Sequence, residues 1–197
     1  MLIAVRHGST KLNGAHGGER TRGWLPVPLT LQGMQEIAET ADALGDLEGV
    51  DGLYSSDLVR AVQSAQEIAR VLGMELQPTE ELRDWNLGDL AGERIASILP
   101  QTHHLIDHPD EKAPGGESYN TFLERAVPFL TKLVESKKLN IAVAHNRIIT
   151  LLAALCKQEG DFPDPQLVKK KGPVDPAGLL IIDPSWKITY THKQAGD

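Results

Sequence analysis

The sequence predicts an α/β fold with three layers, α/β/α, built on a mainly parallel sheet. Short apolar runs over residues 2–5, 52–54 and 141–144 read as buried strands. Segments with apolar residues at helical spacing separate these runs along the chain. Because strands that alternate with helices favour parallel pairing, we expect one layered sheet and a single domain over residues 1–197.

The first two expected helices have clear start and stop signals. Thr30 can cap a helix whose apolar positions share one face, and Gly45 is placed to end it. Ser56 or Asp57 can cap a second helix, which Gly73 is placed to end. The two helices therefore follow the first and second expected strands.

The second half of the chain continues this alternation. Ser118 can cap a helix in which Pro128 is expected to cause a kink, and residues 146–157 read as a further helix. Strands are expected over residues 74–77, 177–182 and 187–191, the last at a sheet edge, and loops over the breaker-rich residues 9–28, 98–116 and 160–176.

Arginine and histidine side chains follow the ends of the expected strands. Arg6 and His7 follow the first strand, and His145 directly follows the run over residues 141–144. Arg60 comes shortly after the run over residues 52–54. The carboxyl ends of parallel strands lie on one edge of a sheet, so these side chains can converge there. Forked guanidinium donors suit phosphate, and a neutral imidazole can act as a nucleophile.

Composition limits the possible partners. The net charge of −7 argues against nucleic acid or an anionic membrane as the main partner, and no apolar run approaches transmembrane length. Cys156 is the only cysteine, so we expect a packed thiol with no disulfide, metal or nucleophilic role. The apolar run at the start is too short for a signal peptide and lacks a basic leader, so a cytoplasmic protein is expected.

A series of motifs resembles one known family. Residues 6–13 (RHGSTKLN) resemble the opening signature of the histidine phosphatase superfamily, which has the phosphoglycerate-mutase-like fold. Residues 55–61 (SSDLVRA) resemble its second arginine motif, and residues 82–92 (LRDWNLGDLAG) resemble the segment that carries its proton donor. Smaller matches occur in family order at residues 28–30 (PLT) with Gly33, 116–118 (GES) and 144–146 (AHN).

The resemblance implies a phosphohistidine mechanism. His7 stands at the position of the nucleophile, and Arg6, Arg60 and His145 stand where the family binds the phosphoryl group. One nitrogen of His7 must attack phosphorus, so the other must donate to a fixed acceptor, such as a carbonyl near Gly8. Arg20 and Arg22 are further sources of positive charge.

Other site residues are implied in the same way. Asp84 stands where relatives carry the acid that protonates the leaving group, and Asp89 and Glu81 are alternative donors. Asn13 can bind phosphate or substrate, or form a turn. Gly23 and Asn146 complete the substrate-binding set. The backbone of Gly23 can approach a ligand. Asn146 stands where the family usually has a glycine, and asparagine tolerates a left-handed backbone better than most residues.

The expected function is a phosphomonoester hydrolase that acts on a small phosphorylated substrate without a cofactor. A phosphoglycerate mutase is an alternative, although the mutase branch carries tyrosine at the position of Leu87 and lysine at that of Ile95. A weakly catalytic phosphate-recognition module is another. No metal is expected, because His103, His104 and His108 lie in a predicted loop without a known ligand spacing. The run of lysines at residues 169–171 reads as a solvated turn.

Overall fold

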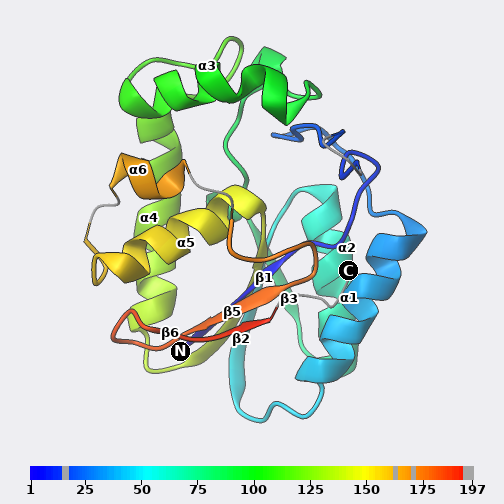
Figure 1. The fold of residues 1–197 in the computed structure, drawn as a ribbon. Helices are drawn as coiled ribbons and strands as arrows, with labels where there is room; N and C mark the ends of the chain where they lie inside the picture. Colours follow the sequence, from blue (N-terminus) through cyan, green and yellow to red (C-terminus); the bar gives the residue numbers. More distant parts are fainter. Residues whose placement is uncertain (15–17, 162–163, 170–171, 193–197) are drawn as a thin grey trace.

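A computed structural model describes residues 1–14, 18–161, 164–169 and 172–192. Its centre is a six-stranded sheet with the strand order β3-β2-β4-β1-β5-β6 (Figure 1). The pairs β2–β3, β2–β4 and β1–β4 are parallel, whereas β5 pairs antiparallel with β1 and β6. The sheet is therefore mixed but mainly parallel, as predicted. The strands are β1 (Leu2–Arg6), β2 (Val50–Ser56), β3 (Leu76–Thr79), β4 (Leu139–Ala144), β5 (Leu179–Ile182) and β6 (Ile188–His192).

The alternating side chains of β1 show how the three layers form. All five residues of β1 are buried. Leu2 and Ala4 belong to one apolar cluster, together with residues of α4 and α5. Ile3 and Val5 belong to a second cluster, with residues of α1 and α2. Because successive side chains of a strand point to opposite faces, this continuously apolar strand needs helices on both sides.

Figure 1 shows the helices arranged to match these clusters. The helices α1 and α2 lie together beside one face of the sheet, and α4 and α5 cover the other. The helix α3 crosses the top of the molecule, above the edge at which β1 and β4 end. The helices are α1 (Leu31–Leu44), α2 (Val59–Leu72), α3 (Ile95–Asp107), α4 (Tyr119–Glu135), α5 (Asn146–Lys157) and α6 (Pro165–Val168), with short 3-10 turns at Glu80–Leu82 and Gly88–Leu90.

Helix caps are confirmed at two of the three expected positions. The hydroxyl of Thr30 accepts from the backbone N–H of Gly33, and that of Ser118 accepts from the N–H of Thr121. The expected cap of α2 by Ser56 or Asp57 is wrong, because Leu58 is the N-cap residue and makes no side-chain cap bond. The carboxylate of Asp57 is instead paired with Arg83.

The largest error of the sequence prediction is the loop expected over residues 98–116. Most of this stretch is the helix α3, which buries Ile98, Thr102, Leu105 and Ile106 at helical spacing. The proline at position 100 hid this pattern, although the helix passes through it. The loop expected over residues 160–176 also contains the short helix α6.

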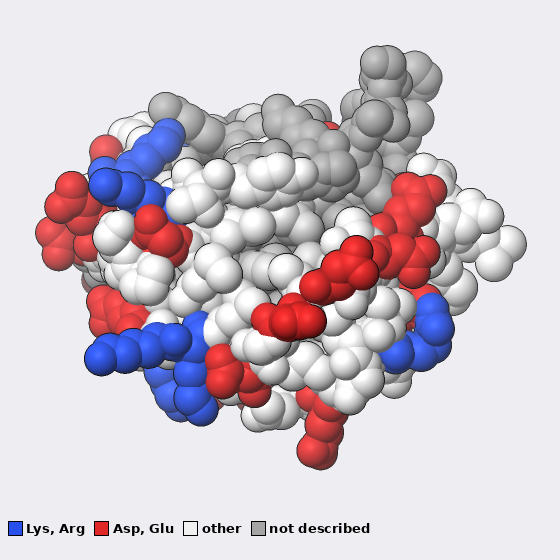
Figure 2. Space-filling model, turned by 90° about the horizontal axis from the view of Figure 1, so that it is seen from below, with Lys and Arg blue, Asp and Glu red and all other residues white. Residues whose placement is uncertain are grey.

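The surface far from the ends of β1 and β4 carries charges of both signs. Figure 2, which views the molecule from below, shows acidic side chains on both sides of this face, including a row from its centre to the right, and separate groups of lysine and arginine at left and right. Within the described residues, no helix has the length and apolar character needed to cross a membrane.

Candidate active site

The pairing of β1 with β4 brings the two predicted histidines together. Arg6 pairs with Ala144 at the end of the parallel ladder, so His7 and His145 are the next residues on the two strands. The N–H of His7 donates to the carbonyl of Ala144 over 3.0 Å. The two imidazole rings lie with their centroids 5.3 Å apart, and both side chains are buried. The convergence predicted from the strand ends is therefore present.

The ring of His7 is held in one orientation by its own loop. Its Nδ1 lies 2.7 Å from the carbonyl oxygen of Gly8, the contact predicted from the sequence. Because a carbonyl only accepts, Nδ1 carries the proton and Nε2 keeps a free lone pair. Burial, together with the charges of Arg60, Arg22 and Arg6, holds the pKa of His7 well below its usual value. The imidazole is thus neutral and has one nitrogen available for attack on an electrophile.

The loop that carries His7 packs directly on the helices α1 and α2. A Cβ on Gly8 would lie 2.3 Å from the carbonyl oxygen of Gly33, and a Cβ on Gly33 would lie 2.1 Å from the carbonyl oxygen of Ser9. Only glycine at both positions allows this approach. On the other side, the N–H of Gly8 donates to the hydroxyl of Ser64, which donates in turn to the carbonyl of Arg60. The loop therefore couples the nucleophile candidate to the helix that carries Arg60.

Arg60 is fully buried and is fixed by the segment that precedes α1. Its Nη2 donates to the carbonyl of Gly23 over 2.8 Å, and its Nη1 donates to that of Leu25 over 3.1 Å. Burial lowers the pKa of Arg60 to about 10, which still leaves it charged at neutral pH. Gly23 has a φ of 45° and directs its carbonyl at Arg60, so its backbone contacts this side chain.

Arg6 and Arg22 extend the positive charge and share an acidic partner. Arg6 Nη1 donates to the carbonyl of Val174 over 3.0 Å, and burial lowers the pKa of Arg6 to about 10. Glu19 Oε1 lies 3.1 Å from Arg22 Nη2 and 3.6 Å from Arg6 Nη2. Arg22 was predicted only as one of two extra cations, yet it is 6% exposed and its charge acts on both histidines. The other, Arg20, donates instead to the carbonyl of Gly92.

Several buried polar atoms of this cluster have no hydrogen-bond partner. They are both ring nitrogens of His145, the Nε atoms of Arg6 and Arg60, and Arg22 Nη1. Buried polar groups are normally satisfied, because an unmade bond costs about 1–3 kcal/mol. Burial, followed by the charge of Arg60, also keeps the pKa of His145 well below its usual value. The cluster is therefore suited to a compact anion with several acceptor oxygens.

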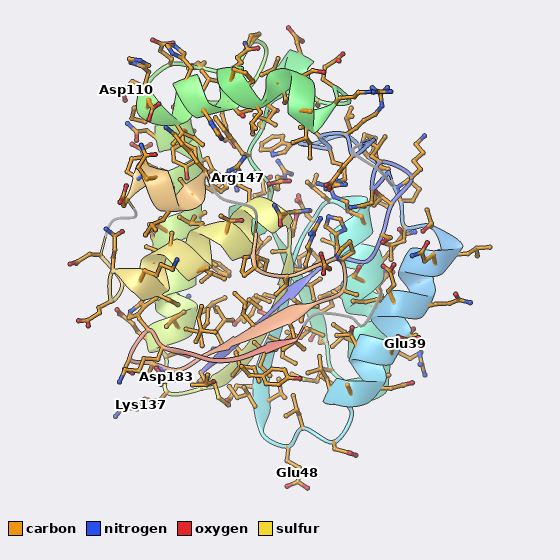
Figure 3. All side chains as sticks on the ribbon, viewed as in Figure 1. Glu39, Glu48, Asp110, Lys137, Arg147 and Asp183 are labelled. Atoms are coloured by element: carbon orange, nitrogen blue, oxygen red, sulfur yellow. The ribbon has the colours of Figure 1, made fainter. Side chains whose placement is uncertain are left out.

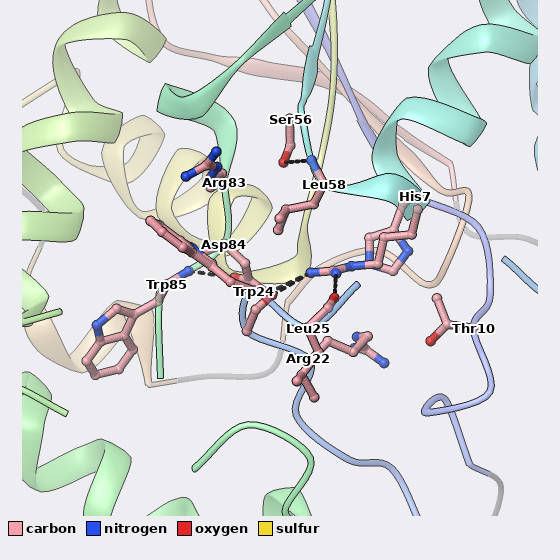
Figure 4. A network of polar contacts seen from close by, with 12 residues as sticks. His7, Thr10, Arg22, Trp24, Leu25, Ser56, Leu58, Arg83, Asp84 and Trp85 are labelled. Atoms are coloured by element: carbon pink, nitrogen blue, oxygen red, sulfur yellow. Dashed lines mark hydrogen bonds and ion pairs between the residues drawn. The ribbon is translucent and has the colours of Figure 1, made fainter. Parts of the chain in front are cut away.

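Asp84 is the predicted proton donor that reaches this cluster. Its Oδ2 lies 4.0 Å from Arg60 Nη2, and its carbonyl accepts from Trp24 Nε1 over 2.8 Å. Figure 4 shows His7, Arg22 and Asp84 approaching one another from separate segments of the chain. Of the alternative donors, Asp89 is exposed, and Glu81 lines a separate surface groove beside Arg125.

The structure gives the two predicted asparagines different surroundings. Asn13 Oδ1 accepts from the backbone and hydroxyl of Thr10, and its amide donates to Glu19, so its polar atoms serve the loop. Asn146 begins α5 in a helical conformation, so the backbone at this position is not left-handed and the tolerance of asparagine for that conformation is not used. Its side chain lines a small pocket that also contains Asp84 and Arg22.

The remaining candidates lie away from this cluster. His103 and His104 are on α3, and His108 is its C-cap residue. His104 Nε2 contacts Glu111, and the described residues contain no group of three or more potential metal ligands. Burial raises the pKa of the Cys156 thiol to about 12, which keeps it protonated. Lys169 pairs with Asp107, and residues 170 and 171 lie outside the described residues.

This fold and site define a class of protein in which a buried neutral histidine lies among several arginines at the edge of a mainly parallel sheet. A family model described as the histidine phosphatase superfamily (branch 1) matches residues 2–169. The chain belongs to this family.

Relatives and solved structures agree with this assignment. The chain is 30% identical to a phosphoglycerate mutase-like protein 4 of Arabidopsis thaliana, over 77% of this chain and 68% of that protein. It is 30% identical to a 2,3-bisphosphoglycerate-dependent phosphoglycerate mutase of Parvibaculum lavamentivorans, over 80% of both chains. The structure of a mycobacterial glucosyl-3-phosphoglycerate phosphatase has a TM-score of 0.71 at 25% identity and covers 91% of this chain and 87% of that one. A Thermus thermophilus protein has a TM-score of 0.72 at 26% identity, over 98% of both chains.

The lowered pKa values of His7 and His145 predict how stability depends on pH. An unfolded histidine titrates at about pH 6.5, so below that pH the unfolded chain binds more protons than the folded one. The free energy of unfolding should therefore fall as the pH drops from about 7 to about 5 and should level off above about 7. Urea titrations across this range measure the slope, and the His7→Gln/His145→Gln variant should have a smaller one. An equal slope in both proteins would contradict the assigned pKa shifts.

Proposed function

We propose that this protein is a metal-independent phosphomonoester hydrolase that works through a phosphohistidine at His7. The observation that carries the proposal is the neutral ring of His7, oriented by the carbonyl of Gly8 and surrounded by Arg6, Arg22 and Arg60. A phosphomonoester dianion repels nucleophiles, so a hydrolase must neutralise the phosphoryl oxygens while its nucleophile stays unprotonated. The low pKa of His7 keeps the nucleophile unprotonated, and the charges of the three arginines neutralise the phosphoryl oxygens.

The phosphoryl oxygens are bound by the atoms that lack partners. The guanidinium groups of Arg6, Arg22 and Arg60 donate forked, charge-assisted hydrogen bonds, and His145 adds a further donor. His7 Nε2 then attacks phosphorus in line with the ester oxygen. The new N–P bond forms as the bond from phosphorus to the ester oxygen breaks. Because the arginines carry the charge stabilisation, the step needs no metal ion.

Asp84 completes both halves of the reaction. Its carboxyl group donates a proton to the departing ester oxygen, which leaves as an alcohol. The resulting carboxylate accepts a proton from the water that attacks the phosphohistidine, and inorganic phosphate is released with neutral His7 restored. Its place beside Arg60 and in the pocket with Arg22 supports this assignment.

A phosphoglycerate mutase is the second candidate, because one similar protein is named a phosphoglycerate mutase and another is named phosphoglycerate mutase-like. The two reactions share the first step and differ in the acceptor of the phosphoryl group. Leu87 and Ile95, which replace the tyrosine and lysine of the mutase branch, both line the pocket beside Asp84. Apolar side chains there offer no donor to a phosphorylated acceptor, which favours transfer to water. Labelled phosphate recovered as inorganic phosphate, rather than in a second phosphoglycerate, separates the two reactions.

The His7→Ala variant tests the nucleophile. Turnover of phosphomonoesters should fall by at least about 10³-fold, because no other side chain replaces the attacking nitrogen. The variant should stay folded, since His7 lies at a strand end and leaves only a small cavity. His104→Ala, which removes an exposed histidine of α3, is the control and should keep full activity. Full activity in His7→Ala would end the phosphohistidine hypothesis. A wild-type protein that binds phosphate without turnover would be a recognition module.

Vanadate and a metal chelator test whether the arginines stabilise the transferring phosphoryl group without a metal ion. Vanadate should inhibit, because it can adopt the geometry of the transferring phosphoryl group, whereas a metal chelator should leave activity intact. A VO₃ complex is known for the mycobacterial phosphatase of similar fold. Steady-state assays with each reagent provide the measurement. Loss of activity with chelator and its recovery with a divalent ion would overturn the metal-independent mechanism.

Asp84→Asn tests the proton donor through the leaving group. Hydrolysis of an alkyl phosphate should slow by about 10²–10⁴-fold, because its leaving oxygen needs a proton. The kcat/KM for a nitrophenyl phosphate should change far less, because its leaving oxygen needs little protonation and kcat/KM does not include the later hydrolysis of the phosphohistidine, in which Asp84 is the base. His7→Ala should reduce both rates alike. An equal loss on both substrates in Asp84→Asn would indicate positioning, and the same comparison on Asp89→Asn and Glu81→Gln would then identify the donor.

A further inference from the structure

The side chain of Arg125, on α4, is turned into the molecule. Glu48 and Lys137 show the usual arrangement of charged side chains, which point away from the fold into solvent (Figure 3). The side chain of Arg125 is only 16% exposed. It extends from α4 to the segment that carries Asp84, and the motifs that resemble the family do not include it.

The two terminal nitrogens of Arg125 bind the main chain of this segment. They donate to four backbone carbonyls, which are those of Glu80 (2.8 Å), Glu81 (3.3 Å), Arg83 (3.1 Å) and Asp84 (3.4 Å). Nη1 makes the first three of these contacts and Nη2 makes the last. Residues 83–87 lie between two short 3-10 turns and are themselves in neither a helix nor a strand. Side-chain donors such as Arg125 therefore help to fix the path of this segment.

Glu117 orients the guanidinium group of Arg125. Its Oε1 accepts from Arg125 Nη2 over 2.9 Å and from the backbone N–H of Asn86 over 2.9 Å. The N–H of Glu117 also donates to the carbonyl of Asn86 over 3.0 Å. Asp84 thus lies between carbonyls held by Arg125 and a residue held by Glu117. The fixed fork of a guanidinium suits this double contact, because its two terminal nitrogens donate in different directions.

The backbone position decides where the carboxyl group of Asp84 lies. A single methylene joins this carboxyl group to the main chain, so it moves little unless the backbone moves with it. Its Oδ2 lies 4.0 Å from Arg60 Nη2. The carbonyl of the same residue accepts from Trp24 Nε1 as well as from Arg125 (Figure 4). A general acid must come within hydrogen-bond distance of the leaving oxygen, so a shift of this segment would weaken its effect.

We propose that Arg125 is a positioning residue that places the carboxyl group of Asp84 for proton transfer, and that Glu117 orients Arg125 for this task. The inference rests on the proposed function, in which Asp84 protonates the leaving oxygen. Arg125 acts through the main chain around Asp84 and takes no part in the chemical steps itself. Its loss should therefore reproduce the kinetic signature of a lost proton donor.

The Arg125→Met variant removes the donors and keeps an unbranched side chain. The kcat/KM for an alkyl phosphate should fall by about 10²-fold, because a displacement of about 1 Å can cost that much. The kcat/KM for a nitrophenyl phosphate should fall by less than about threefold, because its leaving oxygen needs little protonation. A role in folding alone would lower both values by the loss of folded protein, which urea titrations measure. Equal losses on the two substrates would overturn the proposal.

The Arg125→Lys variant separates position from charge. Burial and, more weakly, the charge of Arg125 lower the pKa of His145, and lysine keeps this charge. The single nitrogen of lysine cannot replace the two-sided contacts of the guanidinium, so most of the loss on the alkyl phosphate should remain. Full recovery would show that charge alone matters and would overturn the proposal. Arg70→Met, which removes an exposed arginine paired with Glu67 on α2, is the control and should change neither kcat/KM.

A double variant tests whether Arg125 acts through Asp84. On the alkyl phosphate, Arg125→Met/Asp84→Asn should be no slower than Asp84→Asn alone, because a group that cannot donate gains nothing from its position. Losses that multiply would show an independent role and would overturn the proposal. If Arg125→Met does not fold, Glu117→Gln takes its place. It removes the charge of the orienting carboxylate and should show the same dependence on the leaving group with a smaller loss, whereas equal losses would overturn the proposal.

Failure of this inference can be told apart from failure of the proposed function. The phosphohistidine assignment fails if His7→Ala keeps full activity, and the donor assignment fails if Asp84→Asn loses equally on both substrates. The inference alone fails if Asp84→Asn shows the dependence on the leaving group and Arg125→Met does not. A crystal structure of Arg125→Met adds a readout that needs no turnover. The carboxyl group of Asp84 should have moved from its place beside Arg60, and an unmoved carboxyl group would overturn the inference.

Discussion

The parallel pairing of β1 with β4 is the contact on which the site depends. Its last pair joins Arg6 with Ala144, and the N–H of His7 then donates to the carbonyl of Ala144. A shift of one residue in this register would send the two histidines to opposite faces of the sheet. The apolar side chains of both strands prevent such a shift, because they alternate between two separate clusters. The packing of the core therefore also fixes the geometry of the reacting centre.

The charge of the site opposes its own burial. Three guanidinium groups repel one another and lose water when they surround two imidazoles. Backbone carbonyls reduce this cost: Gly23 and Leu25 accept from Arg60, and Val174 accepts from Arg6. Glu19 adds one negative charge near Arg6 and Arg22. The remaining positive charge keeps the histidines neutral. Repulsion among the guanidinium groups therefore lowers the stability of the fold, but the same charge keeps His7 unprotonated and favours an anionic ligand.

Sequence reasoning worked where a residue follows a regular strand or begins a regular helix. His7, Arg6 and His145 were located because strand ends meet at one sheet edge, and the caps of α1 and α4 were located from Thr30 and Ser118. It failed where long-range packing overrides local signals. Packing of a buried face allowed α3 to form despite a proline in its sequence, and the expected cap at Asp57 was lost to a pairing with Arg83.

The sequence by itself determined the three-layer architecture and the residue types at the ends of β1 and β4, because apolar periodicity and the alternation of strands and helices along the chain are local properties. It also supplied a series of motifs, one of which contains Asp84, and this series points to the family. Tertiary structure alone decided which arginines face His7 and which contact other groups. Arg20 and Arg22 are near neighbours in the chain, yet Arg20 donates to the carbonyl of Gly92, whereas Arg22 is buried and lines the pocket with Asp84. Such a choice depends on the course of an irregular loop, whose path is set by contacts with distant segments and not by the periodicity of its own residues.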